Sequence, residues 1–142
     1  MTKFMPVSAR TALLTGQIDV TDGTLSAVLL DEGYVVDGAH DMLDDVAGGY
    51  RIATALVSGV SVVDGEVYGS VTFTAVAAGP TCTGLWFFMD TGTAATSRLV
   101  AYTDQYGDHR PISSDPIVPN GANVVLTWPA NRLFGLGSPV TI

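Results

Sequence analysis

The chain is poor in cysteine, since Cys82 is the only one in 142 residues. One thiol cannot form an internal disulfide, and it cannot supply the several sulfur ligands of a cysteine-based zinc site. We therefore expect the protein to fold in a reducing compartment such as the cytoplasm. Cys82 stands between two threonines at the start of a predicted strand, with no Lys, Arg or His beside it. Without a neighbouring cation to stabilise a thiolate, the sequence favours a buried structural thiol over a reactive one.

Basic residues are also scarce. Six Lys and Arg oppose fourteen Asp and Glu, which gives a net charge of −8 and a pI near 4.2. A domain with this balance repels phosphate backbones, so we expect no nucleic-acid partner. The hydrophobic content of 47% with only 14% charged residues also argues against a disordered chain.

Long apolar runs are missing as well. No stretch approaches the roughly 18 apolar residues that cross a bilayer, so we expect no membrane partner. The segment Met1–Val7 contains one Lys but no following apolar core, which does not match a signal peptide. The length fits one domain covering residues 1–142, with possible extended arms at 1–7 and 135–142.

What the sequence does contain is the pattern of short strands. The stretch Thr81–Asp104 carries two apolar runs, Leu85–Met89 and Leu99–Tyr102, joined by small residues, and predicts a central hairpin whose first strand is buried on both faces. Asp64-Gly65 predicts a second, tight hairpin. The further predicted strands are Thr24–Leu30, Tyr50–Val57, Val60–Val63, Glu66–Val76, Asn123–Trp128 and a short continuation at Asn131–Phe134.

Two segments have helical features. Ser8–Leu14 predicts a short helix with Ser8 as its N-cap, and Asp37–Val46 predicts a second one with its acids in the early turns. The segment Gln105–Asn120 contains three prolines and predicts a loop. Together these elements indicate a mainly β protein, an antiparallel β-sandwich with one or two short helices.

Residues able to do chemistry do not form a recognisable motif. His40 lies among four acids that would share one short helix, and we interpret the group as a solvated acidic helix start rather than a metal site; the acids are Asp37, Asp41, Asp44 and Asp45. His109 has Ser113 and Ser114 nearby, but the chain has no G-x-S-x-G elbow, so a hydrolase is not indicated. Trp86 and Trp128 occupy strand positions typical of a core rather than of a sugar-stacking surface. We expect no catalytic residue, no metal and no cofactor.

Several segments have a pattern that goes beyond a generic β protein, and they cover most of residues 12–134: ALLTGQIDV, LSAVLLDEGY, HDMLDDVAG, GYRIATA, VTFTAV, DTGTAATSRLVAYTD and PNGANVVLTWPANRLF. Together these segments resemble a group of small virion structural proteins of tailed bacteriophages. The stretch Asp90–Asp104 is the most specific of them, whereas the insert Gln105–Pro119 is longer than the group leads us to expect.

The resemblance implies a non-enzymatic protein made in the host cytoplasm and located on the virion. Capsid decoration on the exterior of the head is the favoured role, with the major capsid protein or other virion proteins as partners. We also expect the protein to form a homo-oligomer, and a trimer is the favoured state. The alternative is a tail-fibre or baseplate accessory that binds host-surface carbohydrate through exposed aromatics such as Tyr106 or Trp128. The residues we expect at an interface are Tyr106, His109, Arg110, Leu136, Val140 and Ile142.

Overall fold

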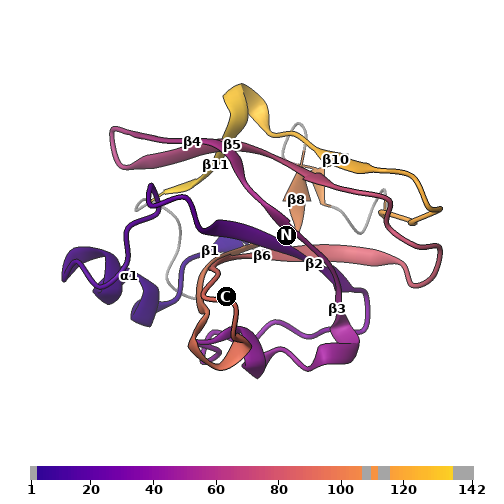
Figure 1. Ribbon diagram of the computed structural model, residues 1–142, viewed down its shortest axis with the longest axis horizontal. Helices are drawn as coiled ribbons and strands as arrows, with labels where there is room; N and C mark the ends of the chain where they lie inside the picture. The colour runs from indigo at the N-terminus through magenta and orange to yellow at the C-terminus, as the bar shows by residue number, and fades with distance from the viewer. Residues whose placement is uncertain (1–2, 107–109, 112–115, 136–142) are drawn as a thin grey trace.

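The computed structural model describes residues 3–106, 110–111 and 116–135, which form two facing antiparallel β-sheets (Figure 1). The larger sheet has five strands in the order β1-β7-β6-β2-β3. Its strands are β1 Lys3–Phe4, β2 Leu25–Asp31, β3 Arg51–Leu56, β6 Cys82–Met89 and β7 Arg98–Thr103. The predicted mainly β sandwich with short helices is therefore confirmed.

The smaller sheet is built around β5, Glu66–Phe73, which alternates buried and exposed side chains along its second half. On one side β5 pairs with β4, Ser58–Val63, through the Asp64-Gly65 turn. Both turn residues have positive φ, 52° and 77°, as the predicted tight hairpin requires. On the other side β11, Arg132–Gly135, pairs with residues 66–68, and β10, Val124–Leu126, pairs with residues 71–73.

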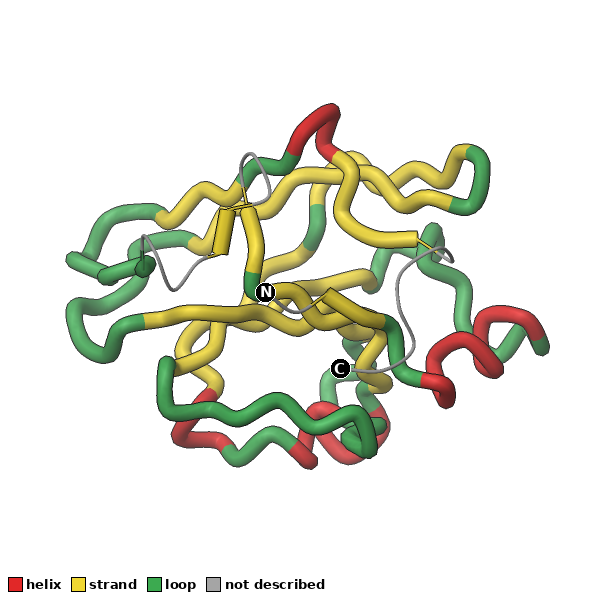
Figure 2. The backbone as a smooth tube through the Cα atoms, turned by 180° about the vertical axis from the view of Figure 1, so that it is seen from behind, coloured by secondary structure: helices red, strands yellow, loops and turns green. Residues whose placement is uncertain are grey.

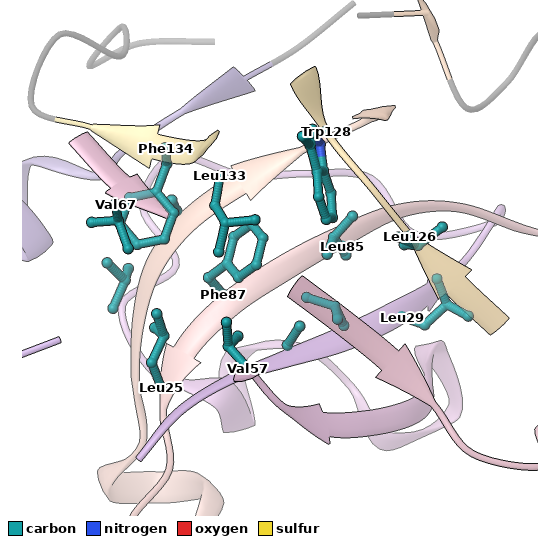
Figure 3. Close-up of a cluster of buried hydrophobic side chains, with 14 of the residues drawn as sticks. Leu25, Leu29, Val57, Val67, Leu85, Phe87, Leu126, Trp128, Leu133 and Phe134 are labelled. Carbon is teal, nitrogen blue, oxygen red and sulfur yellow. The ribbon is translucent and has the colours of Figure 1, made fainter. Parts of the chain in front are cut away.

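Strand β6 is the centre of the packing. Leu85 and Phe87 point into the space between the sheets, where Phe87 contacts the rings of Trp128 and Phe134 at 5.9 and 5.2 Å (Figure 3). Trp86 and Phe88 point to the opposite face and pack in a second apolar cluster. The prediction that this strand is buried on both faces is confirmed, because each face of the sheet is covered by a different layer.

The outer face of the larger sheet is covered by a second layer, which we define as the loop segments and short 3₁₀ turns η1 Leu43–Asp45, η2 Gly48–Tyr50 and η3 Ala94–Thr96. The helix expected over Asp37–Val46 is wrong, since only η1 forms there. The backbone of this segment bonds instead to the end of the β6–β7 connection and to the start of β7: Leu43 N–H donates to Ser97 O, and Leu99 N–H donates to Asp41 O, both at 2.8 Å. These contacts bury Leu43 and Val46, and tertiary pairing therefore overrides the helical pattern.

The single α-helix in the described part of the chain, α1 Val7–Leu14, lies at one end of the sheets (Figures 1 and 2). Ser8 is not its N-cap, because the helix begins one residue earlier with Pro6 in the capping position. The Ser8 hydroxyl instead donates to Asp41 Oδ1 at 2.7 Å. The first described residues do not form a free arm either, since Phe4 pairs with Tyr102 of β7 and is fully buried.

The predicted loop 105–120 contains one short two-stranded ribbon, β8 Gln105–Tyr106 with β9 Arg110–Pro111. Its last part returns to the larger sheet, where Ile117 and Cys82 exchange two backbone hydrogen bonds of 2.8 and 3.1 Å. No helix of the described residues is long and apolar enough to cross a membrane.

Candidate interaction surface

Two of the acids around His40, Asp37 and Asp45, accept hydrogen bonds from backbone N–H groups of their own loop. Asp45 Oδ2 accepts the N–H groups of Asp41 and Met42 at 2.8 and 3.0 Å, and these two backbone bonds lower the pKa of Asp45. Asp37 Oδ1 accepts the N–H of Ala39 at 2.9 Å. Among the described residues no group of three His, Cys, Asp or Glu side chains is arranged to hold a metal ion. These carboxylates therefore fix the course of a loop.

His40 belongs to a chain of hydrogen bonds that starts in the core. The indole N–H of Trp86 donates to Tyr34 Oη at 3.1 Å, and Tyr34 Oη lies 2.9 Å from His40 Nδ1. Burial raises the pKa of the Tyr34 hydroxyl, which stays protonated. Because an indole N–H can only donate, Tyr34 Oη is the acceptor of that hydrogen bond. On the other side of the imidazole ring, His40 Nε2 lies 4.0 Å from Asp37 Oδ2. This arrangement satisfies a buried indole and anchors the loop over the sheet.

Cys82 and the two tryptophans are buried, as the sequence predicts. Cys82 is fully buried, and burial together with Asp31 and Glu32 raises the pKa of its thiol to about 11. Trp86 is fully buried, and Trp128 is only 4% exposed. The core position predicted for Trp128 is confirmed, because its ring packs on Phe87 between the sheets, and it is not one of the exposed aromatics that the carbohydrate-binding alternative requires.

An apolar groove of about 200 Å³ opens between α1, the β4–β5 hairpin and the end of β11. None of the described residues that line it is charged. The lining residues are Met5, Leu13, Leu14, Val20, Val62, Gly65, Val67, Phe134 and Gly135. Met5 and Phe134 form a buried floor, and Val67 lies beside Phe134 (Figure 3). We call this site the apolar groove.

The rim of the apolar groove leaves large aliphatic side chains in solvent. Leu14 at the end of α1 is 77% exposed, and Val62 of β4 is 46% exposed. Two larger hollows, of about 440 and 550 Å³, are lined partly by Ser, Asn, Asp or Arg side chains. Exposed aliphatic groups around a concave apolar floor are typical of a site that binds another apolar segment.

The residues predicted for an interface lie mostly elsewhere. Tyr106 and Arg110 are paired through their backbones in the β8–β9 ribbon, and their side chains are outside the described part. His109, Leu136, Val140 and Ile142 also lie outside the described residues. Sequence reasoning missed the apolar groove. The sequence features that could have indicated it are two pairs of adjacent aliphatic residues, Leu13-Leu14 before Gly16 and Val62-Val63 before the Asp64-Gly65 turn.

The fold defines the chain as a mainly β, antiparallel sandwich with a helix at one end. No protein-family model, curated protein or solved structure matches the chain.

Proposed function

We propose that the protein is a structural component of a tailed-bacteriophage virion, a decoration protein bound to the outside of the capsid. Two features support the proposal. One is the resemblance carried by segments such as Asp90–Asp104, and the other is the apolar groove, which is the observation on which the binding role depends. In this role the protein contributes contacts between neighbouring subunits and performs no reaction.

The apolar groove provides a physical basis for such contacts. Burying a leucine or valine side chain completely contributes about 1.5–3 kcal/mol, and Leu14 and Val62 have much of their surface still available. None of the described residues that line the groove carries a charge, and Glu66 lies beside Gly135 at its edge. Repetition of a modest contact over a symmetric particle stabilises the particle, because a ligand that binds only the assembled state raises its stability by mass action.

The deciding experiment is the location of the protein in a virion density map, combined with binding of the purified protein to capsids that lack it. We expect density on the outside of the head and binding that weakens at least tenfold in the variants Leu14→Asp and Val62→Asp. Both side chains are exposed, so the substitutions leave the folded protein intact. Val125→Asp is the matched control, because Val125 is 60% exposed on β10 and does not line the groove.

Density on a tail fibre or baseplate would refute the decoration role and favour the carbohydrate-binding alternative, which a glycan array tests directly. Capsid binding that is equally weakened by the groove variants and by Val125→Asp would refute the assignment of the groove as the binding surface.

A further inference from the structure

One of the two larger hollows lies on the outer face of the smaller sheet, and the proposed function does not use it. Its volume is about 440 Å³, and it forms where β4, β5 and the turn η5, Pro129–Asn131, come together (Figure 1). This volume is typical of small-molecule sites, which range from about 300 to 1,000 Å³. We call it the serine hollow, after the polar residues in its lining, which are Ser58, Ser61, Tyr68, Ser70 and Asn131.

Strand pairing brings the hydroxyl groups of the serine hollow to one face of the β4–β5 hairpin. Ser61 of β4 pairs with Tyr68 of β5, and Ser58 pairs with Ser70. Residues directly opposite each other in an antiparallel pair project to the same face, and so do residues two apart on one strand. The three serines therefore surround the Tyr68 side chain on a common surface.

The turn η5 supplies an amide group at the border of the serine hollow. Ala130 and Asn131 both have positive φ, 54° and 59°, and they turn the chain from β10 into β11. This course brings Asn131 to the wall of the hollow. Its side-chain amide both donates and accepts hydrogen bonds, as the neighbouring hydroxyl groups do.

These groups are not used by the fold itself. Within the described part of the chain, no side-chain hydrogen bond is made by the three serines, by Tyr68 or by Asn131. Tyr34, Tyr50 and Tyr102 each pack against another aromatic ring, whereas Tyr68 packs against no ring among the described residues. The serine hollow thus combines a single aromatic side chain with a set of unengaged donors and acceptors.

We propose that the serine hollow binds a neutral sugar ring. A pyranose has a face of C–H groups, which the Tyr68 ring can cover, and a rim of hydroxyl groups, which need both donors and acceptors. The serine hydroxyls and the Asn131 amide supply both. None of the described residues that line the hollow is charged, and the net charge of −8 disfavours anionic ligands. Arg132 pairs with Tyr68 on β11 but is not part of the lining.

The serine hollow is separate from the apolar groove. Val67 lines the groove and Tyr68 lines the hollow, and adjacent residues of a strand point to opposite faces of the sheet. A sugar can therefore occupy the hollow while another subunit covers the groove. The inference does not depend on the proposed function, and failure of either proposal leaves the other standing.

The test is a titration of the full, isotope-labelled chain with the methyl glycosides of glucose, galactose and mannose, followed by amide chemical shifts. We expect saturable binding of at least one of them with a Kd of about 1–10 mM, and the largest shifts at residues that line the serine hollow. Sorbitol is the matched ligand control, because it has the hydroxyl groups without the ring face, and it should bind at least tenfold more weakly.

Three outcomes of the titration would overturn the proposal. They are the absence of saturable shifts with all three glycosides, shifts centred away from the hollow, and binding of sorbitol equal to that of the sugars. Methyl glucuronide is the charged comparison, and tighter binding of it than of methyl glucoside would overturn the assignment to neutral sugars.

Variants locate the binding site independently. Tyr68→Ala removes the aromatic ring and Ser70→Leu fills the hollow from an exposed position, so each should weaken sugar binding at least tenfold. Tyr68→Phe should stay within about threefold of the original, since the ring remains. Val125→Ala is the matched control, because Val125 is 60% exposed on β10 and lies outside the hollow, and it should not change the affinity. Unchanged binding in Ser70→Leu would overturn the proposal even if Tyr68→Ala failed to fold.

Discussion

Gly84 of β6 lies under the ring of Tyr102 of β7, and replacing it with alanine should disturb the larger sheet. A Cβ at this position would lie 2.6 Å from Tyr102 Oη, 3.1 Å from Cζ and 3.2 Å from Cε2. The ring cannot easily move away, because it packs against Phe4 and Trp86 with centroid distances of 5.8 and 5.4 Å. The new methyl group must therefore displace part of a buried aromatic cluster.

Two opposing effects decide the size of the change. Overpacking a core typically costs about 1–3 kcal/mol, whereas replacing glycine with alanine inside a strand gains about 0.5–1 kcal/mol of backbone entropy. The net expectation for Gly84→Ala is a loss of roughly 1–2 kcal/mol in the free energy of unfolding. For a chain of 142 residues this loss lowers the Tm by about 3–8 °C.

Urea and thermal unfolding followed by tryptophan fluorescence measure the effect. Gly79→Ala is the matched control, since a Cβ there would meet nothing within 4 Å, and its stability should be unchanged or slightly higher. Tyr102→Phe removes the nearest atom, so the cost of Gly84→Ala should fall by about 1 kcal/mol in that background. An equal cost in both backgrounds, or no cost at all, would refute the reasoning.

Three further predictions concern the second layer and the thiol. Asp45→Ala should cost about 1 kcal/mol, because two backbone N–H groups lose their acceptor. Those donors lower the pKa of Asp45 below its ordinary value of 3.8 in the folded protein. The contribution of Asp45 to the free energy of unfolding should therefore be present above pH 3.8 and disappear as the pH falls through the lowered pKa. Urea unfolding at several pH values measures this dependence. Tyr34→Phe should cost about 1–2 kcal/mol in urea unfolding, because the buried Trp86 N–H loses its acceptor. Cys82, with a thiol pKa of about 11, should react with a disulfide reagent only at the rate of unfolding.

Each of these has a control in the same part of the fold. Asp44→Ala removes another exposed acid from η1 and should cost less than half as much as Asp45→Ala. Tyr50→Phe removes the hydroxyl of a residue that is 39% exposed and whose ring packs beside Tyr34, and it should leave the stability within about 0.5 kcal/mol of the original. Val35→Cys introduces a thiol at an 82%-exposed position and should react at once. Equal effects in variant and control would contradict the corresponding prediction.

Local patterns in the sequence were sufficient for much of the fold. The Asp64-Gly65 turn and the aromatic run of β6 were recognisable because a tight turn demands particular residues and a strand covered on both faces demands a continuous apolar run. Burial of Cys82 was predicted because no Lys, Arg or His stands beside it in the sequence. The positions of most strands and the mainly β class could be predicted because they depend on such short-range requirements.

The prediction of a helix at Asp37–Val46 was wrong because of contacts with residues that are distant in the sequence. The acids and aliphatics of this segment have helical spacing, but the backbone of Asp41 bonds to Leu99 of β7, and the backbone of Leu43 bonds to Ser97 just before that strand. The short strand at Lys3–Phe4 was missed likewise, because two residues carry no periodic signal and form a strand only when β7 offers an edge.

The sequence by itself determined the class of the fold, the impossibility of a disulfide within these 142 residues and the acidic character, because each depends on composition or on residues adjacent in the chain. Only the tertiary structure decided where the apolar groove lies, since its walls come from α1, the β4–β5 hairpin and β11, which are brought together by sheet pairing. Exposure of a leucine is a property of what packs around it, and that depends on distant segments.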